Sequence, residues 1–192
     1  VEPCRPFSGN RKGITLGEAA AVFLMTRDDI SPSSLRLLGA GESADAHHMT
    51  APDPEGKGAA LAMERSLADS GLSAGDIDYV NLHGTGTALN DAMESRALSR
   101  IFPSGVPASS TKSLTGHTLG AAGSLELGIC WLALSPAFNP DHLIPPQTWD
   151  GHPDPELPEI DLVTERRTSP ALSACMSNSF AFGGCNVSLV IG

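Results

Sequence analysis

A short segment, residues 77–82, leads directly into His83 and a loop rich in glycine and threonine, His83-Gly-Thr-Gly-Thr87. The alternating residues of the segment predict a β-strand, and residues 90–102 after the loop have the pattern of an amphipathic helix closed by Pro103. In open α/β sheets, ligand-binding residues follow the carboxyl ends of strands. This feature therefore predicts an α/β protein in which His83 belongs to a ligand site.

The rest of the chain continues the alternation of strands and helices. The predicted elements are strands at 14–27, 35–38, 107–110, 160–163, 171–176 and 186–191, and helices at 58–71 and 118–134. Small residues in 14–27 and 120–123 predict close packing against a neighbouring backbone. We expect the proline-rich stretch 136–158 to be a surface excursion and 178–186 to be a turn. The order of elements predicts one layered α/β domain over residues 1–192.

Composition limits the classes of partner and the compartment. A formal net charge of −10 argues against nucleic acid and anionic membranes as partners. Four widely spaced cysteines contain no C-x-x-C unit, so we expect reduced thiols in a cytoplasmic protein. The longest apolar stretch, 125–134, is far shorter than the roughly 20 residues that span a bilayer. Because the chain opens at Val1, we expect it to be a fragment.

A second motif, Ser110-Thr-Lys112-Ser-Leu-Thr-Gly-His117, makes an active site more probable than two unrelated loop histidines. Two neutral imidazole N–H groups can stabilise negative charge on a carbonyl oxygen, and a helix that begins after His117 would add a positive dipole end. Lys112 could be a solvated surface lysine. Glu126, however, lies inside a mostly apolar helix and needs a cation, so we expect the two to pair.

Two further patterns carry weaker signals. The turn Phe180-Ala-Phe182-Gly-Gly184 is either a strand connector or a source of a backbone N–H for an oxyanion. His47 and His48 are adjacent and have no further ligands at metal-binding spacing, so no metal site is expected. The chain has no Walker loop and no complete dinucleotide fingerprint, so no nucleotide cofactor is implied.

Several motifs, in their order along the chain, together resemble those of the β-ketoacyl-acyl carrier protein synthases. The motifs are Cys4-Arg-Pro-Phe7, Gly17-Glu18, the His83–Thr87 loop with Asp91 and Glu94, Ser110-Thr-Lys-Ser113, Gly116-His-Thr-Leu-Gly-Ala-Ala-Gly123 and Asn178-Ser-Phe-Ala-Phe-Gly-Gly184. They extend through nearly the whole chain and correspond to the carboxyl-terminal half of such an enzyme.

The resemblance implies a thiolase-like layered αβα fold and a decarboxylating Claisen condensation. In that reaction, an acyl chain on a cysteine is joined to malonyl carried on acyl carrier protein. His83 and His117 match the two histidines that promote malonyl decarboxylation and stabilise the enolate. Lys112 matches the lysine that orders the site, and Glu126 matches its carboxylate partner.

The resemblance also assigns the remaining site residues. The backbone N–H of Phe182 matches one arm of the oxyanion hole, and its ring matches the gate to the acyl pocket. Phe180, in the same turn, is expected to contribute to substrate binding. Thr85 and Thr87 match residues that hydrogen-bond the phosphopantetheine arm. No cofactor is expected to bind directly, because the substrate is carried on the phosphopantetheine of acyl carrier protein.

The expected partners are acyl carrier protein, the N-terminal half of the same enzyme, and a second subunit in a homodimer or a ketosynthase heterodimer. The family's nucleophilic cysteine lies in the other half, in a small-residue turn followed by serines. None of the four cysteines has that setting, so this chain alone is not expected to complete a condensation. The family's usual Arg-Asp-Gly is Arg11-Lys-Gly13 here, and Ser8 replaces an aspartate.

Two alternatives stay open. A thiolase has a similar Gly-His segment and a late cysteine, for which Cys185 could stand, but its Asn-Glu-Ala-Phe type motif is replaced here by His83–Thr87. A non-catalytic partner subunit, such as a chain-length factor, would have no need to retain His83, Lys112 and His117. The residue in the nucleophile position upstream of Val1 decides between the latter and a ketosynthase.

Overall fold

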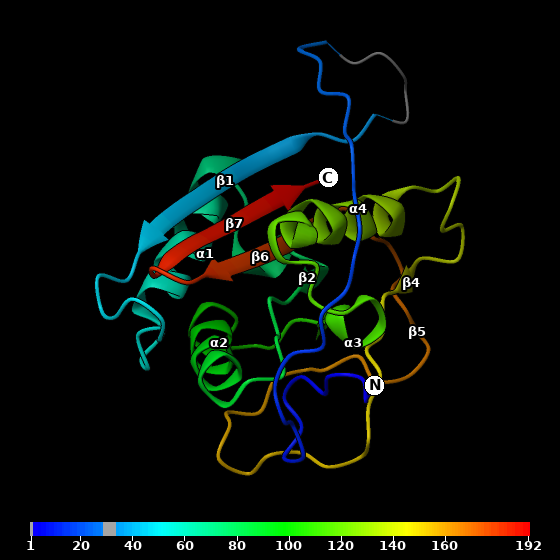
Figure 1. Ribbon diagram of the computed structural model, residues 1–192. Coiled ribbons are helices and arrows are strands. Elements are labelled where there is room, and N and C mark those ends of the chain that lie inside the picture. Colours follow the sequence, from blue (N-terminus) through cyan, green and yellow to red (C-terminus); the bar gives the residue numbers. More distant parts are fainter. Residues whose placement is uncertain (1, 29–33) are drawn as a thin grey trace.

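The computed structural model describes residues 2–28 and 34–192, and its centre is a mixed sheet with strand order β1-β7-β6-β2-β3 (Figure 1). Its strands are β1 (Leu37–Ala44), β2 (Tyr79–Asn81), β3 (Ala108–Ser109), β6 (Cys175–Ala181) and β7 (Cys185–Ile191). β7 runs antiparallel to its two neighbours β1 and β6, whereas β2 runs parallel to both β6 and β3. A separate two-stranded ladder pairs β4 (Leu143–Ile144) with β5 (Arg167–Thr168).

Helices cover both faces of the sheet. α1 (Lys57–Ser70) and α2 (Ala88–Ile101) pack on one face, and α4 (Ala122–Leu134) packs on the other. A one-turn helix, α3 (Lys112–Thr115), and a 3-10 turn over Leu119–Ala121 connect β3 to α4.

Side chains of the central strands alternate between these two layers. Tyr79 of β2 and Cys175 of β6 are buried against α4, whereas their neighbours Val80 and Met176 are buried against α1 and α2. Both faces of these strands carry apolar side chains that leave water on folding. Covering both faces favours an arrangement of three layers, with the sheet between helices. The αβα architecture expected from the resemblance is therefore confirmed.

Two glycines let helices approach the sheet closely. A Cβ added to Gly41 of β1 would lie 2.0 Å from the carbonyl oxygen of Ala62, so α1 rests directly on the β1 backbone. A Cβ on Gly123 of α4 would lie 3.1 Å from Oγ of Ser179 in β6. Close packing on the small residues of 120–123 is thus confirmed at Gly123, whereas Gly120 has open space around it.

The expectation of a buried strand over residues 14–27 is wrong. Apart from one bridge between Leu16 and His117, the segment pairs with no strand of the described residues, and Val22 is 95% exposed. It runs in extended form across α4, where Phe23 lies near Gly128, and then leaves the sheet (Figure 1). The expected close neighbour does exist at Gly17, because a Cβ there would lie 2.1 Å from the Thr115 carbonyl oxygen.

Other differences concern boundaries. The helices predicted at 58–71 and 90–102 and the strands at 77–82 and 107–110 correspond to α1, α2, β2 and β3. The first short strand begins at Leu37, not at residue 35, and continues to Ala44. Residues 160–163 form only a bridge from Leu162 to Ala108. The final turn is shorter than 178–186, because β6 continues to Ala181 and glycines 183 and 184 take positive φ angles of 87° and 76°.

The proline-rich stretch 136–158 is a largely irregular excursion, as predicted, but it is anchored to the core. It contributes β4, and both Ile144 and Gln147 are buried. Within residues 2–28 and 34–192, no helix is long and apolar enough to cross a membrane.

Candidate active site

The carboxyl ends of two parallel strands bring the candidate catalytic residues together. His83 follows β2 by two residues, and Lys112 follows β3 by three. β2 and β3 pair in register, Val80 with Ala108 and Asn81 with Ser109, so their loops emerge at the same sheet edge. Parallel pairing thus places residues 29 positions apart side by side.

Lys112 links two other site residues. Its Nζ pairs with the Glu126 carboxylate of α4 and lies 3.4 Å from Nδ1 of His83. Lys112 and Glu126 are each 1% exposed, so the pair is fully buried. The pairing predicted from the sequence is therefore present, and its second contact is the imidazole of His83.

The two histidine rings lie edge to face, with centroids 5.4 Å apart and an interplanar angle of 86°. Nδ1 of His117 accepts a hydrogen bond from the Leu119 backbone N–H at 3.2 Å, and Nδ1 of His83 faces the Lys112 ammonium. A ring nitrogen that accepts is unprotonated, so both neutral imidazoles carry their proton on Nε2. Each histidine can therefore donate one N–H to a ligand.

The charge state of the two imidazoles follows from their surroundings. Burial, followed by the charges of Lys112 and His117, lowers the pKa of His83 well below 6.5. Burial and the Lys112 charge also lower the pKa of His117. Both rings are thus neutral at pH 7, as hydrogen-bond donation to a developing oxyanion requires.

This protonation state predicts a pH dependence for the full-length protein. Since the folded-state pKa of His83 lies well below 6.5, the neutral ring persists as the pH falls through 6.5 and is lost only in more acidic buffer. For the malonyl decarboxylation that the sequence resemblance implies, we expect kcat to be constant between about pH 7.5 and 6.5 and to decline below that range. A rate profile recorded in constant ionic strength checks this, and an acid midpoint at or above pH 6.5 would contradict it.

Two buried acidic side chains of α2 hold the His83 loop. Glu94 accepts the backbone N–H groups of His83 and Gly84, each at 2.7 Å, and Asp91 accepts that of Gly86 at 3.2 Å. Burial raises the pKa of Glu94 to about 8 and that of Asp91 to about 6. Because the pKa of each group is higher in the folded than in the unfolded chain, each contributes to the free energy of unfolding at low pH. This contribution falls as the pH rises toward the folded-state pKa.

The sequence motifs include Asp91 and Glu94 but do not predict that their side chains hold the His83 loop. The available signal was the presence of two acids on the helix that directly follows a glycine-rich loop. Asp91 also accepts the Phe7 backbone N–H at 2.8 Å, so α2 fixes the N-terminal segment as well as the loop.

The other predicted site residues lie at different distances from the histidines. The Phe180 ring contacts the His83 ring, with centroids 5.8 Å apart. The hydroxyls of Thr85 and Thr87 are 2.9 Å apart and so share a hydrogen bond. Phe182 lies beyond the end of β6 and is 84% exposed, and no ring contact joins it to either histidine among the described residues.

Two buried oxygens of site residues, Glu126 Oε2 and Asn81 Oδ1, have no hydrogen-bond partner within the described part of the chain. Asn81 pairs in register with Ser177 of β6 and faces the α4 side of the sheet. Among residues 2–28 and 34–192, no group of three His, Cys, Asp or Glu side chains forms a metal-binding cluster.

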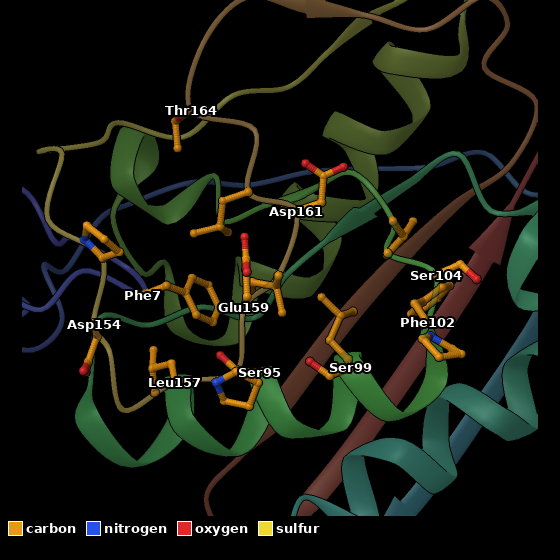
Figure 2. A pocket seen from close by; sticks show the side chains of 18 of the residues that line it. Phe7, Ser95, Ser99, Phe102, Ser104, Asp154, Leu157, Glu159, Asp161 and Thr164 are labelled. Atoms are coloured by element: carbon orange, nitrogen blue, oxygen red, sulfur yellow. The ribbon is translucent and has the colours of Figure 1, made fainter.

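A cavity of about 940 Å³ lies elsewhere, between α2 and the excursion (Figure 2). Ser95 and Ser99 of α2, and Phe102 directly after this helix, line one side, and Leu157 and Glu159 line the other. Neither histidine nor Lys112 lines it. The sheet edge where the two imidazoles and the Lys112 ammonium group lie together is the better candidate for the active site.

Comparison with known proteins agrees with this geometry. The family model "Beta-ketoacyl synthase, C-terminal domain" matches residues 35–144, which include His83, Lys112, His117 and Glu126. The chain belongs to the β-ketoacyl synthase family. The match covers β1 through β4 and thus the whole of the sheet edge where the histidines lie.

Relatives among curated proteins extend this likeness to nearly the whole chain. The 3-oxoacyl-[acyl-carrier-protein] synthase 2 of Coxiella burnetii is 39% identical over 97% of this β-ketoacyl synthase chain. The mitochondrial 3-oxoacyl-[acyl-carrier-protein] synthase of Arabidopsis thaliana is 40% identical over 98%. The chain covers 46% and 42% of these two relatives, so it spans less than half their length.

Solved structures support the β-ketoacyl synthase fold. A ketosynthase, ApeO, in complex with its chain length factor ApeC from Xenorhabdus doucetiae, is 45% identical with a TM-score of 0.86. The match covers 98% of this chain and 46% of that one. A β-ketoacyl synthase from Burkholderia phymatum is 32% identical with a TM-score of 0.85, over 99% of this chain and 46% of that one.

Proposed function

We propose that the protein containing this chain is a β-ketoacyl-acyl carrier protein synthase of fatty acid or polyketide synthesis. The observation that carries the proposal is the pair of neutral imidazoles, each with its proton on Nε2, beside the buried Lys112–Glu126 pair. Two adjacent N–H donors beside a buried cation suit the negative charge that develops on a thioester oxygen in an enolate.

In the proposed reaction, the bond between the malonyl α-carbon and its carboxylate breaks, and CO₂ leaves. The electron pair moves onto the α-carbon and the thioester oxygen, where the Nε2–H groups of His83 and His117 donate hydrogen bonds. The carbanion then attacks an acyl thioester on a cysteine of the N-terminal half, and that cysteine leaves as a thiolate. The backbone N–H of Phe182 is proposed to stabilise the second oxyanion, and Thr85 and Thr87 to bind the phosphopantetheine arm.

The proposed partners are the N-terminal half of the same enzyme, acyl carrier protein and a second ketosynthase subunit. The first of these is supported by the chain's own exposed apolar surface. α4 is apolar around most of its circumference, with Leu132 45% exposed, and the unpaired segment 14–27 crosses it. A helix of that composition is normally covered on both sides. The cytoplasmic location expected from the sequence stays a prediction.

The test is an assay of the full-length protein with malonyl-acyl carrier protein and an acyl primer. We expect release of CO₂ together with a β-ketoacyl-acyl carrier protein product, detected by mass spectrometry. A cysteine in a small-residue turn upstream of Val1 is expected to carry the acyl group. Glutamine in its place, with decarboxylation but no condensation, would instead indicate a partner subunit, and acetyl transfer to coenzyme A would indicate a thiolase.

A further inference from the structure

Gln147 is a buried polar residue whose side-chain amide both accepts and donates a hydrogen bond. It lies in the proline-rich excursion and is 3% exposed. Its Oε1 accepts the Ser110 backbone N–H at 3.0 Å, and its Nε2 donates to the Pro6 carbonyl at 3.0 Å. The side chain thus joins the N-terminal segment to the end of β3. Neither the motifs of the sequence nor the proposed reaction gives it a role.

Ser110 connects Gln147 to both catalytic loops. Its hydroxyl donates to the Gly84 carbonyl at 2.6 Å, one residue after His83, and Lys112 follows it by two residues. The next residue of the excursion also takes part, because the Thr148 backbone N–H donates to Oγ of Ser113 at 2.9 Å. Residues 147 and 148 therefore bind the turn that contains Lys112 at two points, one before the lysine and one after it.

Such support is needed because α3 has only four residues. A single helical turn is not stable by itself, and a lysine side chain has many rotamers. Yet Lys112 must reach Glu126 and His83 at the same time. We propose that Gln147 is a positioning residue, which sets the Lys112–His83 contact through Ser110. The inference rests on the proposed function, since its effect is measured on malonyl decarboxylation.

The experiment compares Gln147→Leu and Gln147→Glu in the full-length protein. Leucine has similar volume but leaves the Ser110 N–H buried without an acceptor, whereas glutamate keeps an acceptor oxygen. We expect kcat for decarboxylation of malonyl-acyl carrier protein to fall about tenfold to a hundredfold in Gln147→Leu and less in Gln147→Glu. KM should change little, because Gln147 does not line the loop of Thr85 and Thr87.

A matched control is available in the same excursion. Asn139 is also a buried amide, and it donates to the carbonyls of Ala133 and Leu143 at 2.7 and 2.9 Å and accepts the Leu143 N–H at 2.9 Å. None of these partners belongs to the site. Asn139→Leu should lower the melting temperature of the protein as Gln147→Leu does, but leave kcat within about twofold of wild type.

The pH profile separates positioning from loss of stability. Since the Lys112 charge lowers the pKa of His83, a displaced lysine should move the acid limb of the rate profile of Gln147→Leu upward, and Asn139→Leu should leave it in place. Equal losses of kcat in the two leucine variants, or an unchanged kcat in Gln147→Leu, would refute the inference alone. A wild-type protein without decarboxylation activity would refute the proposed function and this inference with it.

Discussion

Replacing His83 with alanine in the full-length protein is expected to reduce CO₂ release from malonyl-acyl carrier protein by at least about a hundredfold. The imidazole of His83 is buried between Lys112, His117 and Phe180. Its removal takes away one Nε2–H donor to the enolate and leaves Lys112 without its second contact. The measurement is the rate of CO₂ release under saturating substrate, with no acyl primer present.

His152→Ala is the control for this variant. His152 is an exposed histidine whose ring contacts the backbone carbonyl of Asp150, far along the excursion from the sheet edge. We expect its decarboxylation rate to equal that of wild type. A His83→Ala protein that is folded by circular dichroism and still releases CO₂ at the wild-type rate would remove His83 from the mechanism.

The second large effect is expected from Lys112→Met. This change leaves the Glu126 carboxylate in a buried place without a cation, and breaking a buried ion pair typically costs about 3–5 kcal/mol of unfolding free energy. Burial already raises the pKa of Glu126 and Lys112 opposes that rise, so Glu126 in the variant takes up a proton and the cost falls toward the lower figure. Decarboxylation should fall strongly as well, because Nδ1 of His83 loses the donor that fixes its tautomer.

The double variant Lys112→Met with Glu126→Met distinguishes the two effects. Two methionines of similar volume replace the pair without leaving a charge, so unfolding free energy should recover to within about 1–2 kcal/mol of wild type. Decarboxylation should not recover. Denaturant titration and CO₂ release are measured on wild type, Lys112→Met and the double variant. Recovery of both quantities in the double variant would show that Lys112 serves only the fold.

The layers and the core of the site follow from local patterns in the sequence. The Gly-Thr loop after an apolar segment places His83 at the end of a strand, and an acid within an apolar helix requires the cation that Lys112 supplies. The place of His83 depends on strand geometry, and the pairing of Glu126 depends on the cost of burying a charge. Both can be recognised from a few neighbouring residues in the sequence. The resemblance added the roles of these residues, which no spacing could give.

Long-range pairing explains most of what the sequence did not reveal. β2 lies between β3 and β6, and residues 79–81 pair with residues 175–177, far along the chain. Gln147 lies in a stretch without periodicity, and only the folded excursion places its amide between Ser110 and Pro6. Residues 14–27 have the composition of a buried strand, but composition does not say which sheet contains its partner.

That unpaired segment has a practical consequence for handling the protein. Residues 20–26 are extended and largely apolar, and Val22, Leu24 and Met25 face solvent. A strand with free backbone N–H and C=O groups is a template for pairing with other molecules, as in aggregation. Residues 1–192 produced alone would therefore self-associate. Co-production with the proposed N-terminal half, rather than a change of salt or detergent, is the expected route to a monodisperse preparation.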